Sequence, residues 1–193
     1  MLEHHKENGT IIVVGCDEAG AGCFAGAVFA SAVVLPSDYH SNILDDSKKL
    51  TDKKRRLVYD DIINNAIAYS IQSVSAEEID EINILQARFR AMDLAIKDLS
   101  VKPELCLIDG DKFLKDYHTR FECHIKGDGR FYNIAGASVL AKVSKDDEML
   151  RLHEEYSMYS WASNKSYGTK QHKDAIREHG LSPYHRKSFN IIL

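Results

Sequence analysis

The sequence predicts an α/β fold in which a central mixed β-sheet is flanked by helices. Two apolar segments near the N-terminus, residues 10–17 and 27–35, are separated only by a short loop rich in glycine, which predicts an antiparallel hairpin. The later apolar segments alternate with stretches of helical spacing, and such an alternation is typical of helices packed on a sheet. No internal repeat or low-complexity linker interrupts the 193 residues, so we expect one domain over residues 1–193.

The first half of the chain contains three predicted strands and a helix. Residues 10–17 are apolar and rich in β-branched side chains, and residues 27–35 form a second such run that Pro36 ends. Thr51 is a suitable N-cap for a helix. The apolar face of this helix contains Leu57, Val58, Ile62 and Ala66. Residues 68–74 predict a third strand.

The middle of the chain predicts one long helix followed by two strands. Ser75 and Glu78 have the spacing of a capping box, which opens a helix. Its apolar residues are Ile79, Ile82, Leu85, Phe89, Met92 and Leu99. Residues 105–109 and 121–125 are short apolar strands.

Two further helices are predicted in the last third of the chain. A long one begins at Ile134, where small residues allow close packing, and the last covers residues 172–178 before Gly180 and Pro183.

Composition excludes several classes of protein. The hydrophobic fraction is 44% and the charged fraction 28%, as in a globular protein with a core. No apolar run approaches the ~20 residues of a membrane span, and the polar N-terminus is no signal peptide. The four cysteines include no C-x-x-C pair, which argues against a zinc or thioredoxin-type site and favours reduced thiols in the cytoplasm. They are Cys16, Cys23, Cys106 and Cys123.

Positive charge is concentrated in two stretches, although the net charge is −4. The first stretch contains Lys48, Lys49, Lys53, Lys54, Arg55 and Arg56. The second contains Lys165, Lys170, Lys173, Arg177, Arg186 and Lys187. Solvated helix faces explain most such runs. Two of them beside an acidic site would also suit a bound polyanion.

Acidic residues follow three predicted strands: Asp17 with Glu18, then Asp109, then Asp128. Strand ends converge in α/β sheets, so these carboxylates are candidates for one site. Clustered carboxylates repel one another unless cations lie between them, and Mg²⁺ or Mn²⁺ prefers such oxygen ligands. Two such ions ~4 Å apart are the usual apparatus of phosphodiester hydrolysis. Each acid taken alone also fits a turn residue or a helix cap.

Neighbouring residues of a regular strand point to opposite faces. Asp17 and Glu18 therefore both act as side-chain ligands only if the strand ends there, and the glycines at 20 and 22 are compatible with such an ending.

The glycine loop (residues 20–26) resembles a dinucleotide-binding motif only superficially. Its spacing is G-x-G-x-x-x-G, and a β-branched strand follows where a pyrophosphate site needs a helix N-terminus. A nucleotide-binding oxidoreductase is therefore a secondary hypothesis, and a tight hairpin turn is the simpler interpretation.

Several motifs of the sequence resemble bacterial type 2 ribonuclease H, in the order of that family and over residues 15–189. They are CDEAGAGCFAGAVFASAVVL, DDSKKLTDKKR, IDEINILQA, LIDGD, KGDGRFYNIAGASVLAKVSKD, KSYGTKQH and SPYHRKSF. Such a series is far more specific than any single motif.

The resemblance implies a ribonuclease H-like fold and cleavage of RNA paired to DNA. It implies that Asp17, Glu18, Asp109 and Asp128 are the catalytic, metal-binding acids, with two Mn²⁺ or Mg²⁺ ions during catalysis. The cut would fall 5′ of a ribonucleotide, single ribonucleotides in duplex DNA included, and leave a 3′-hydroxyl and a 5′-phosphate.

Substrate-binding residues also follow from the resemblance. The family's Gly-Arg-Gly loop, which reads the 2′-hydroxyl, corresponds to Gly20, Ala21 and Gly22, and its sugar-packing tyrosine to Tyr167. Lys48 and Lys49 are candidates for holding a phosphate. The sequence departs from the family at Ala21, where arginine is usual, and at Gly168, where proline often stands. The family's C-terminal helical extension is essentially missing, so we expect no clamp-binding tail.

A few positions support more than one interpretation. Ser138, Lys142 and Asp146 share one face of the predicted helix, where Lys142 and Asp146 also fit an ordinary ion pair. His172 and His185 either line the site or cap local structure.

The function expected from these observations is that of a monomeric, cytoplasmic endonuclease acting on RNA/DNA hybrids and on DNA that contains ribonucleotides. The alternative is a catalytically impaired hybrid-binding variant of the same fold, because Ala21 replaces the loop arginine.

Overall fold

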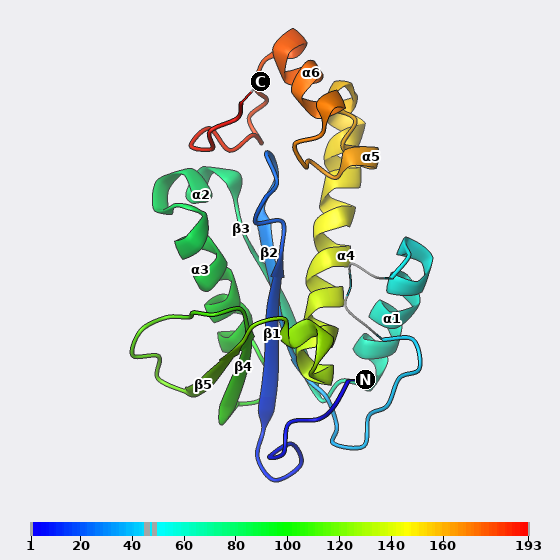
Figure 1. Cartoon of the computed structure of the whole chain (residues 1–193), viewed down its shortest axis with the longest axis vertical. Coiled ribbons are helices and arrows are strands. Elements are labelled where there is room, and N and C mark those ends of the chain that lie inside the picture. Colours follow the sequence, from blue (N-terminus) through cyan, green and yellow to red (C-terminus); the bar gives the residue numbers. More distant parts are fainter. Residues whose placement is uncertain (1, 45–46, 48–49, 193) are drawn as a thin grey trace.

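The computed structural model describes residues 2–44, 47 and 50–192, and a five-stranded sheet forms its centre (Figure 1). The strands are β1 (Val13–Ala19), β2 (Val28–Val34), β3 (Ala68–Val74), β4 (Leu105–Asp109) and β5 (Arg120–His124), in the spatial order β3-β2-β1-β4-β5. β2 pairs antiparallel with β1 and β3, whereas β4 pairs parallel with β1 and β5. The predicted mixed sheet and its N-terminal hairpin are confirmed.

Helices cover both faces of this sheet, with α2 and α3 on one side and α1 and α4 on the other (Figure 1). They are α1 (Asp52–Asn65), α2 (Ala76–Ile82), α3 (Ile84–Lys97), α4 (Tyr132–Glu155), α5 (Trp161–Asn164) and α6 (Lys170–His179), with short 3₁₀ helices η1 (Gly127–Gly129) and η2 (Ser157–Tyr159). The hydroxyls of Thr51 and Ser75 accept hydrogen bonds from the N–H groups of Lys54 and Glu78, so both predicted caps are confirmed. Within the described ranges, every helix is too short or too polar to cross a bilayer.

The prediction of one long helix after Ser75 is wrong. The helix is interrupted at Asn83, whose φ of 66° is incompatible with a right-handed helix. α2 therefore ends before Asn83 and α3 begins after it. The Asn83 side-chain oxygen accepts hydrogen bonds from the N–H groups of Leu85 and Gln86, which makes it the N-cap of α3. The apolar spacing continues through the break and therefore hides it.

The strands alternate their side chains between two hydrophobic cores. On one face, Cys16 and Ile108 pack with Met92 of α3. On the other face, Val13 and Leu107 pack with Ile134 of α4. This alternation decides which helix each strand residue meets at the end of the sheet.

The C-terminal region packs against the last turns of α4, at the end of the molecule where α5 and α6 lie (Figure 1). Its core contains Met149, Leu152, Tyr159, Trp161 and Ile176. Ala25 of the glycine loop belongs to the same core, so this region is joined to the loop that follows β1.

Candidate active site

Asp17 and Asp109 lie on neighbouring strands and on the same face of the sheet. The parallel register pairs Cys16 of β1 with Ile108 of β4, so the two aspartates follow in adjacent positions. Both continue the series of residues that faces α4. Asp17 is only 4% exposed. The pairing of β1 with β4 therefore places two carboxylates side by side, as the strand-end argument expects.

The surroundings of Asp17 disfavour its ionised form. Burial raises the pKa of Asp17 well above its usual range, and the negative charges of Glu18 and Asp109 raise it further. Hydrogen bonds from the Ser138 hydroxyl and from the Glu18 N–H, 2.7 Å from Asp17 Oδ1, act in the opposite direction. A cation bound among these groups would favour the ionised carboxylate.

Asp128 comes to the same place through η1. The Oδ1 atom of Asp109 accepts hydrogen bonds from the N–H groups of Gly127, at 2.8 Å, and Asp128, at 3.4 Å. A Cβ atom at Gly127 would lie 2.6 Å from Cδ1 of Ile134, so only glycine allows this approach to α4. Asp128 is buried, and its N–H group contacts the Asp109 carboxylate, so it is the third candidate acid at this place.

Glu18 occupies the opposite face of the sheet. β1 continues to Ala19, and the Glu18 side chain forms an ion pair with Arg88 of α3, at 2.6 Å. The strand does not end between Asp17 and Glu18, so strand alternation separates their side chains. Glu18 still lies close enough to raise the pKa of Asp17. Sequence reasoning missed Arg88, because nothing in its helical context distinguishes it from a solvated arginine.

These residues fit the divalent ions that the family resemblance implies. The donors are carboxylate oxygens, which Mg²⁺ and Mn²⁺ prefer, and burial together with the negative charges of Glu18 and Asp109 raises the pKa of Asp17. A bound cation would offset these negative charges.

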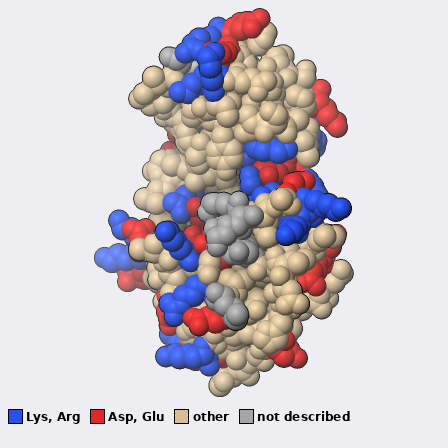
Figure 2. Space-filling model, turned by 45° about the vertical axis from the view of Figure 1, so that its right-hand side comes forward, with Lys and Arg blue, Asp and Glu red and all other residues tan. Residues whose placement is uncertain are grey.

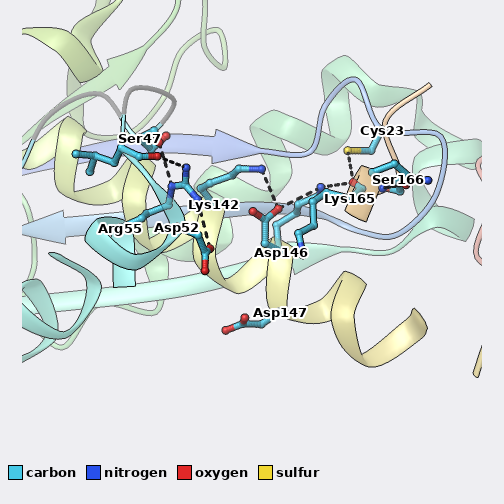
Figure 3. Close-up of polar contacts among 12 residues, drawn as sticks. Cys23, Ser47, Asp52, Arg55, Lys142, Asp146, Asp147, Lys165 and Ser166 are labelled. Carbon is cyan, nitrogen blue, oxygen red and sulfur yellow. Dashed lines mark hydrogen bonds and ion pairs between the residues drawn. The ribbon is translucent and has the colours of Figure 1, made fainter. Parts of the chain in front are cut away.

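The face of α4 next to Asp17 holds the residues expected beside the acids. Ser138 is buried, and its hydroxyl lies 2.9 Å from that of Ser47. One turn further, Lys142 Nζ donates to Asp146 Oδ1 at 2.8 Å (Figure 3). The ion-pair interpretation of Lys142 and Asp146 is therefore observed, and it keeps the ammonium group of Lys142 beside the site.

Tyr167 lies where α4 approaches the glycine loop. Tyr167 is 41% exposed, and the Nζ atoms of Lys145 and Lys142 lie 4.6 and 5.4 Å from its ring centroid. Partial burial raises the pKa of Tyr167 to about 12, so the phenol is neutral at physiological pH. This arrangement presents an aromatic face flanked by positive charge, which suits a sugar–phosphate chain.

The glycine loop is bound to the segment that contains Tyr167. The N–H group of Phe24 donates to the Ser166 carbonyl at 2.8 Å, and the Cys23 thiol donates to the Lys165 carbonyl at 3.5 Å (Figure 3). A Cβ atom at Gly168 would lie 2.3 Å from the Phe24 ring, so the departure from proline at this position goes with the packing of Phe24.

The remaining predicted site residues lie in the glycine loop, in the C-terminal region or outside the described residues. Ala21 is half-buried and Gly22 is exposed at the tip of the glycine loop. Lys48 and Lys49 lie outside the described residues. His172 and His185 are buried in the C-terminal region, with their Nε2 atoms 3.1 Å apart, and Trp161 Nε1 donates to His172. The structure therefore favours local structural roles for both histidines.

Several residues of the two basic stretches form ion pairs with acids. Arg56 pairs with Asp147 of α4, and Lys170 and Arg177 both pair with Asp174 in α6. Arg55 is buried and donates to backbone carbonyls near the start of α1. Figure 2 shows one face of the molecule, on which positive and negative side chains are interspersed.

Comparison with known proteins gives a consistent result. The family model described as Ribonuclease HII matches residues 14–192. The chain is 52% identical over 185 residues to the ribonuclease HII of Bacteroides thetaiotaomicron, covering 96% of this chain and 92% of that one. It is 50% identical over 192 residues to the ribonuclease HII of Parabacteroides distasonis, covering 100% and 96%.

Solved structures show the same fold at low sequence identity. The ribonuclease H2 from Pyrococcus horikoshii OT3 has a TM-score of 0.76 at 22% identity and covers 93% of this chain and 94% of that chain. Bst-RNase HIII in complex with Mn²⁺ has a TM-score of 0.73 at 16% identity and covers 96% and 69%. The fold is thus the ribonuclease H-like α/β fold that the motifs imply. The family model and the two bacterial relatives extend over nearly all of the sequence, and the chain belongs to the ribonuclease HII family of nucleases.

Proposed function

We propose that this protein hydrolyses the RNA strand of RNA/DNA hybrids and cuts 5′ of ribonucleotides embedded in duplex DNA, leaving a 3′-hydroxyl and a 5′-phosphate. The observation that carries the proposal is the grouping of Asp17, Asp109 and Asp128 on one side of the sheet. A residue that acts as a covalent nucleophile is not needed, because carboxylates that hold cations supply the required electrostatics.

Asp17, Glu18, Asp109 and Asp128 would hold two divalent ions, Mn²⁺ or Mg²⁺. When bound, such ions activate water for in-line attack on the phosphate and stabilise the leaving 3′-oxygen. Ser138 orients Asp17 through its hydroxyl. For the side chain of Glu18 to take part, its ion pair with Arg88 would be exchanged for the cation.

The substrate would lie over the glycine loop and Tyr167. Gly20, Ala21 and Gly22 present main-chain groups to the 2′-hydroxyl, which distinguishes RNA from DNA. Tyr167 packs against the neighbouring sugar, and Lys142 attracts the phosphate beside the acids. Lys48 and Lys49 contribute a further phosphate contact. We propose that the chain does this as a single catalytic domain and a monomer in the cytoplasm, where its unpaired cysteines remain reduced.

The alternative is a hybrid-binding protein with impaired turnover, and one observation favours it. Ala21 stands where the family has an arginine, so the loop itself has no side chain that can grip a phosphate.

Cleavage of three matched duplexes tests the proposal: continuous RNA/DNA, DNA with one ribonucleotide, and DNA alone, each with and without Mg²⁺ or Mn²⁺. We expect metal-dependent cuts 5′ of the ribonucleotide in the first two and none in the third. Binding of the first two duplexes without cleavage would favour the alternative. Equal treatment of all three would contradict both hypotheses.

A further inference from the structure

Arg186 contacts the buried side of the glycine loop, although the two lie far apart in the sequence. Its side chain is 0% exposed. The guanidinium donates three hydrogen bonds, all to backbone carbonyls of the loop and the residue after it. They run from Nη1 to Ala21 at 3.0 Å, from Nε to Gly26 at 3.1 Å and from Nη2 to Ala27 at 3.2 Å. One side chain thus fixes both ends of the loop.

Burying the Arg186 cation is energetically costly, which indicates that this side chain does more than fill space in the core. Burial lowers the pKa of Arg186 to about 10, and nearby negative charges, those of Glu148 and Asp80 among them, act in the opposite direction. Glu148 instead accepts from the N–H group of Ala27, at 3.1 Å. A well-packed apolar side chain often replaces a buried charge without loss of stability. The observed contacts are instead specific for the orientation of the loop backbone.

The contact with Ala21 decides where the next N–H group points. In a trans peptide the C=O and N–H bonds point in opposite directions, and no cis peptide occurs among the described residues. Because the Ala21 carbonyl points inward to Arg186, the Gly22 N–H points outward. Gly22 is exposed, and a Cβ atom there would meet nothing within 4 Å. A charged donor on the carbonyl also polarises the peptide and strengthens its N–H as a donor.

The backbone around Arg186 reinforces this arrangement. The Arg186 N–H donates to the Phe24 carbonyl at 2.8 Å, and the Gly26 N–H donates to the Tyr184 carbonyl at 3.0 Å. The loop is therefore paired with residues 184–186 on one side and with the Tyr167 segment on the other.

We propose that Arg186 is a positioning residue that orients and polarises the Ala21–Gly22 peptide, so that the Gly22 N–H donates to the 2′-oxygen of a ribonucleotide. The inference rests on the proposed function and adds to it the residue that sets the donor. With Ala21 in the loop, recognition depends on this main-chain group. Arg186 itself touches no substrate atom.

The test measures discrimination between a duplex with one ribonucleotide and the same duplex in DNA alone. Binding is compared in an Asp17→Asn background, which keeps the duplex intact, with and without Arg186→Lys. Lysine keeps the charge but not the planar fork that reaches three carbonyls. Arg177→Lys, at an exposed arginine of α6, is the matched control.

We expect Arg186→Lys to lower the ratio of the two dissociation constants by about tenfold, equivalent to about 1.4 kcal/mol, while affinity for the all-DNA duplex changes less than about twofold. The Gly22 amide proton should move upfield in the free protein, because its peptide loses a charged partner. Arg177→Lys should change neither quantity. A role in stability alone would change the melting temperature but not the ratio.

Two outcomes would overturn the proposal, and they differ in meaning. If the parent binds both duplexes equally, the proposed recognition of the 2′-hydroxyl fails and the inference fails with it, while cleavage of the three duplexes tests the proposed activity separately. If the parent discriminates and Arg186→Lys discriminates equally well, only the inference fails. If Arg186→Lys does not fold, the test uses the Asp17→Asn parent alone. Its Gly22 amide resonance must shift more on binding the ribonucleotide duplex than on binding the all-DNA duplex, and equal shifts would refute the proposal.

Discussion

At the scale of single residues, the protonation of Asp17 is the main electrostatic feature of the candidate site. Its carboxyl group is buried beside Asp109, with Glu18 behind it on the other face of β1. The pKa of the folded Asp17 lies above its unfolded value, so folding favours the protonated acid. This contribution to stability is fully present below the ordinary pKa of an aspartate, about 3.9, and is lost as the pH rises through the folded pKa.

Asp17→Asn should therefore uncouple stability from activity. Without metal, the variant should be more stable than the wild type at neutral pH, because the amide carries no charge to be buried beside Asp109 and Glu18. Cleavage should fall by at least about a hundredfold, because a ligand that organises several kcal/mol of electrostatic stabilisation is removed. Thermal melts from acid to alkaline pH and single-turnover cleavage measure both. Cleavage at the wild-type rate would refute the metal-site assignment.

Ala21→Arg should increase activity. The added guanidinium can form paired, charge-assisted hydrogen bonds to a phosphate, worth roughly 1.5–3 kcal/mol, which corresponds to about ten- to a hundredfold in kcat/KM. A lone ribonucleotide depends more on the junction than a continuous hybrid does, so the gain should be larger on the former. Both substrates must be compared at matched salt, because phosphate contacts are screened. Ala21→Lys is the control for charge without the fork, and no gain on either substrate would contradict the prediction.

At the scale of elements, the contact of β1 with α4 sets the geometry of the site. Gly15 lies beneath the first turn of α4, where a Cβ atom would be 2.2 Å from the carbonyl carbon of Asn133 and 2.3 Å from the N atom of Ile134. The Asn133 side chain in turn donates to the Val13 carbonyl at 2.7 Å. This close approach brings Ser138, further along α4, within reach of Asp17.

Gly15→Ala should consequently damage both stability and activity. Backbone atoms on both sides cannot move apart independently, so we expect a loss of about 3 kcal/mol or more in the free energy of unfolding. Denaturant titration measures it, and cleavage should fall because α4 is displaced from Asp17. Gly129→Ala, where a Cβ atom meets nothing within 4 Å, is the matched control and should change stability by less than about 0.5 kcal/mol. If Gly15→Ala and Gly129→Ala were equally stable, β1 and α4 could move apart at little cost, and the prediction would be wrong.

At the scale of the whole molecule, the sheet supplies the acids and the C-terminal region supplies the support of the glycine loop. Asp17 and Asp109 come from central strands, whereas Tyr167 and Arg186 come from the region packed on the last turns of α4. The candidate site thus combines residues from both ends of the chain, and under the proposed function metal binding would link its protonation state to its activity.

Activity should depend on pH and metal concentration together. The raised pKa of Asp17 means that metal competes with protons for this carboxylate, so at limiting Mg²⁺ or Mn²⁺ the rate should rise with pH through and above the range of an ordinary aspartate. Saturating metal should shift the rise to lower pH and flatten it. Profiles of kcat/KM at low and high metal measure the shift. Identical profiles at both concentrations would rule out this coupling.

The sequence by itself determined the fold class and most strand positions, and it named the candidate acids. Residues 68–74 and 105–109 were predicted with the bounds of β3 and β4, because short apolar runs between turn residues have few alternatives. The family motifs predicted Asp17, Asp109 and Asp128 as site residues, and the register of β1 and β4 brings the first two together.

Only the tertiary structure decided which side chains share a face and which distant residues meet. Strand alternation turns Glu18 toward Arg88 because β1 continues to Ala19, and no local pattern shows where a strand ends. Asn83 breaks a helix whose apolar spacing is uninterrupted, because its side chain caps α3. Arg186 donates a hydrogen bond to the Ala21 carbonyl, although the two residues lie at opposite ends of the sequence. Such contacts depend on packing between elements, whereas sequence patterns report mainly the periodicity within each element.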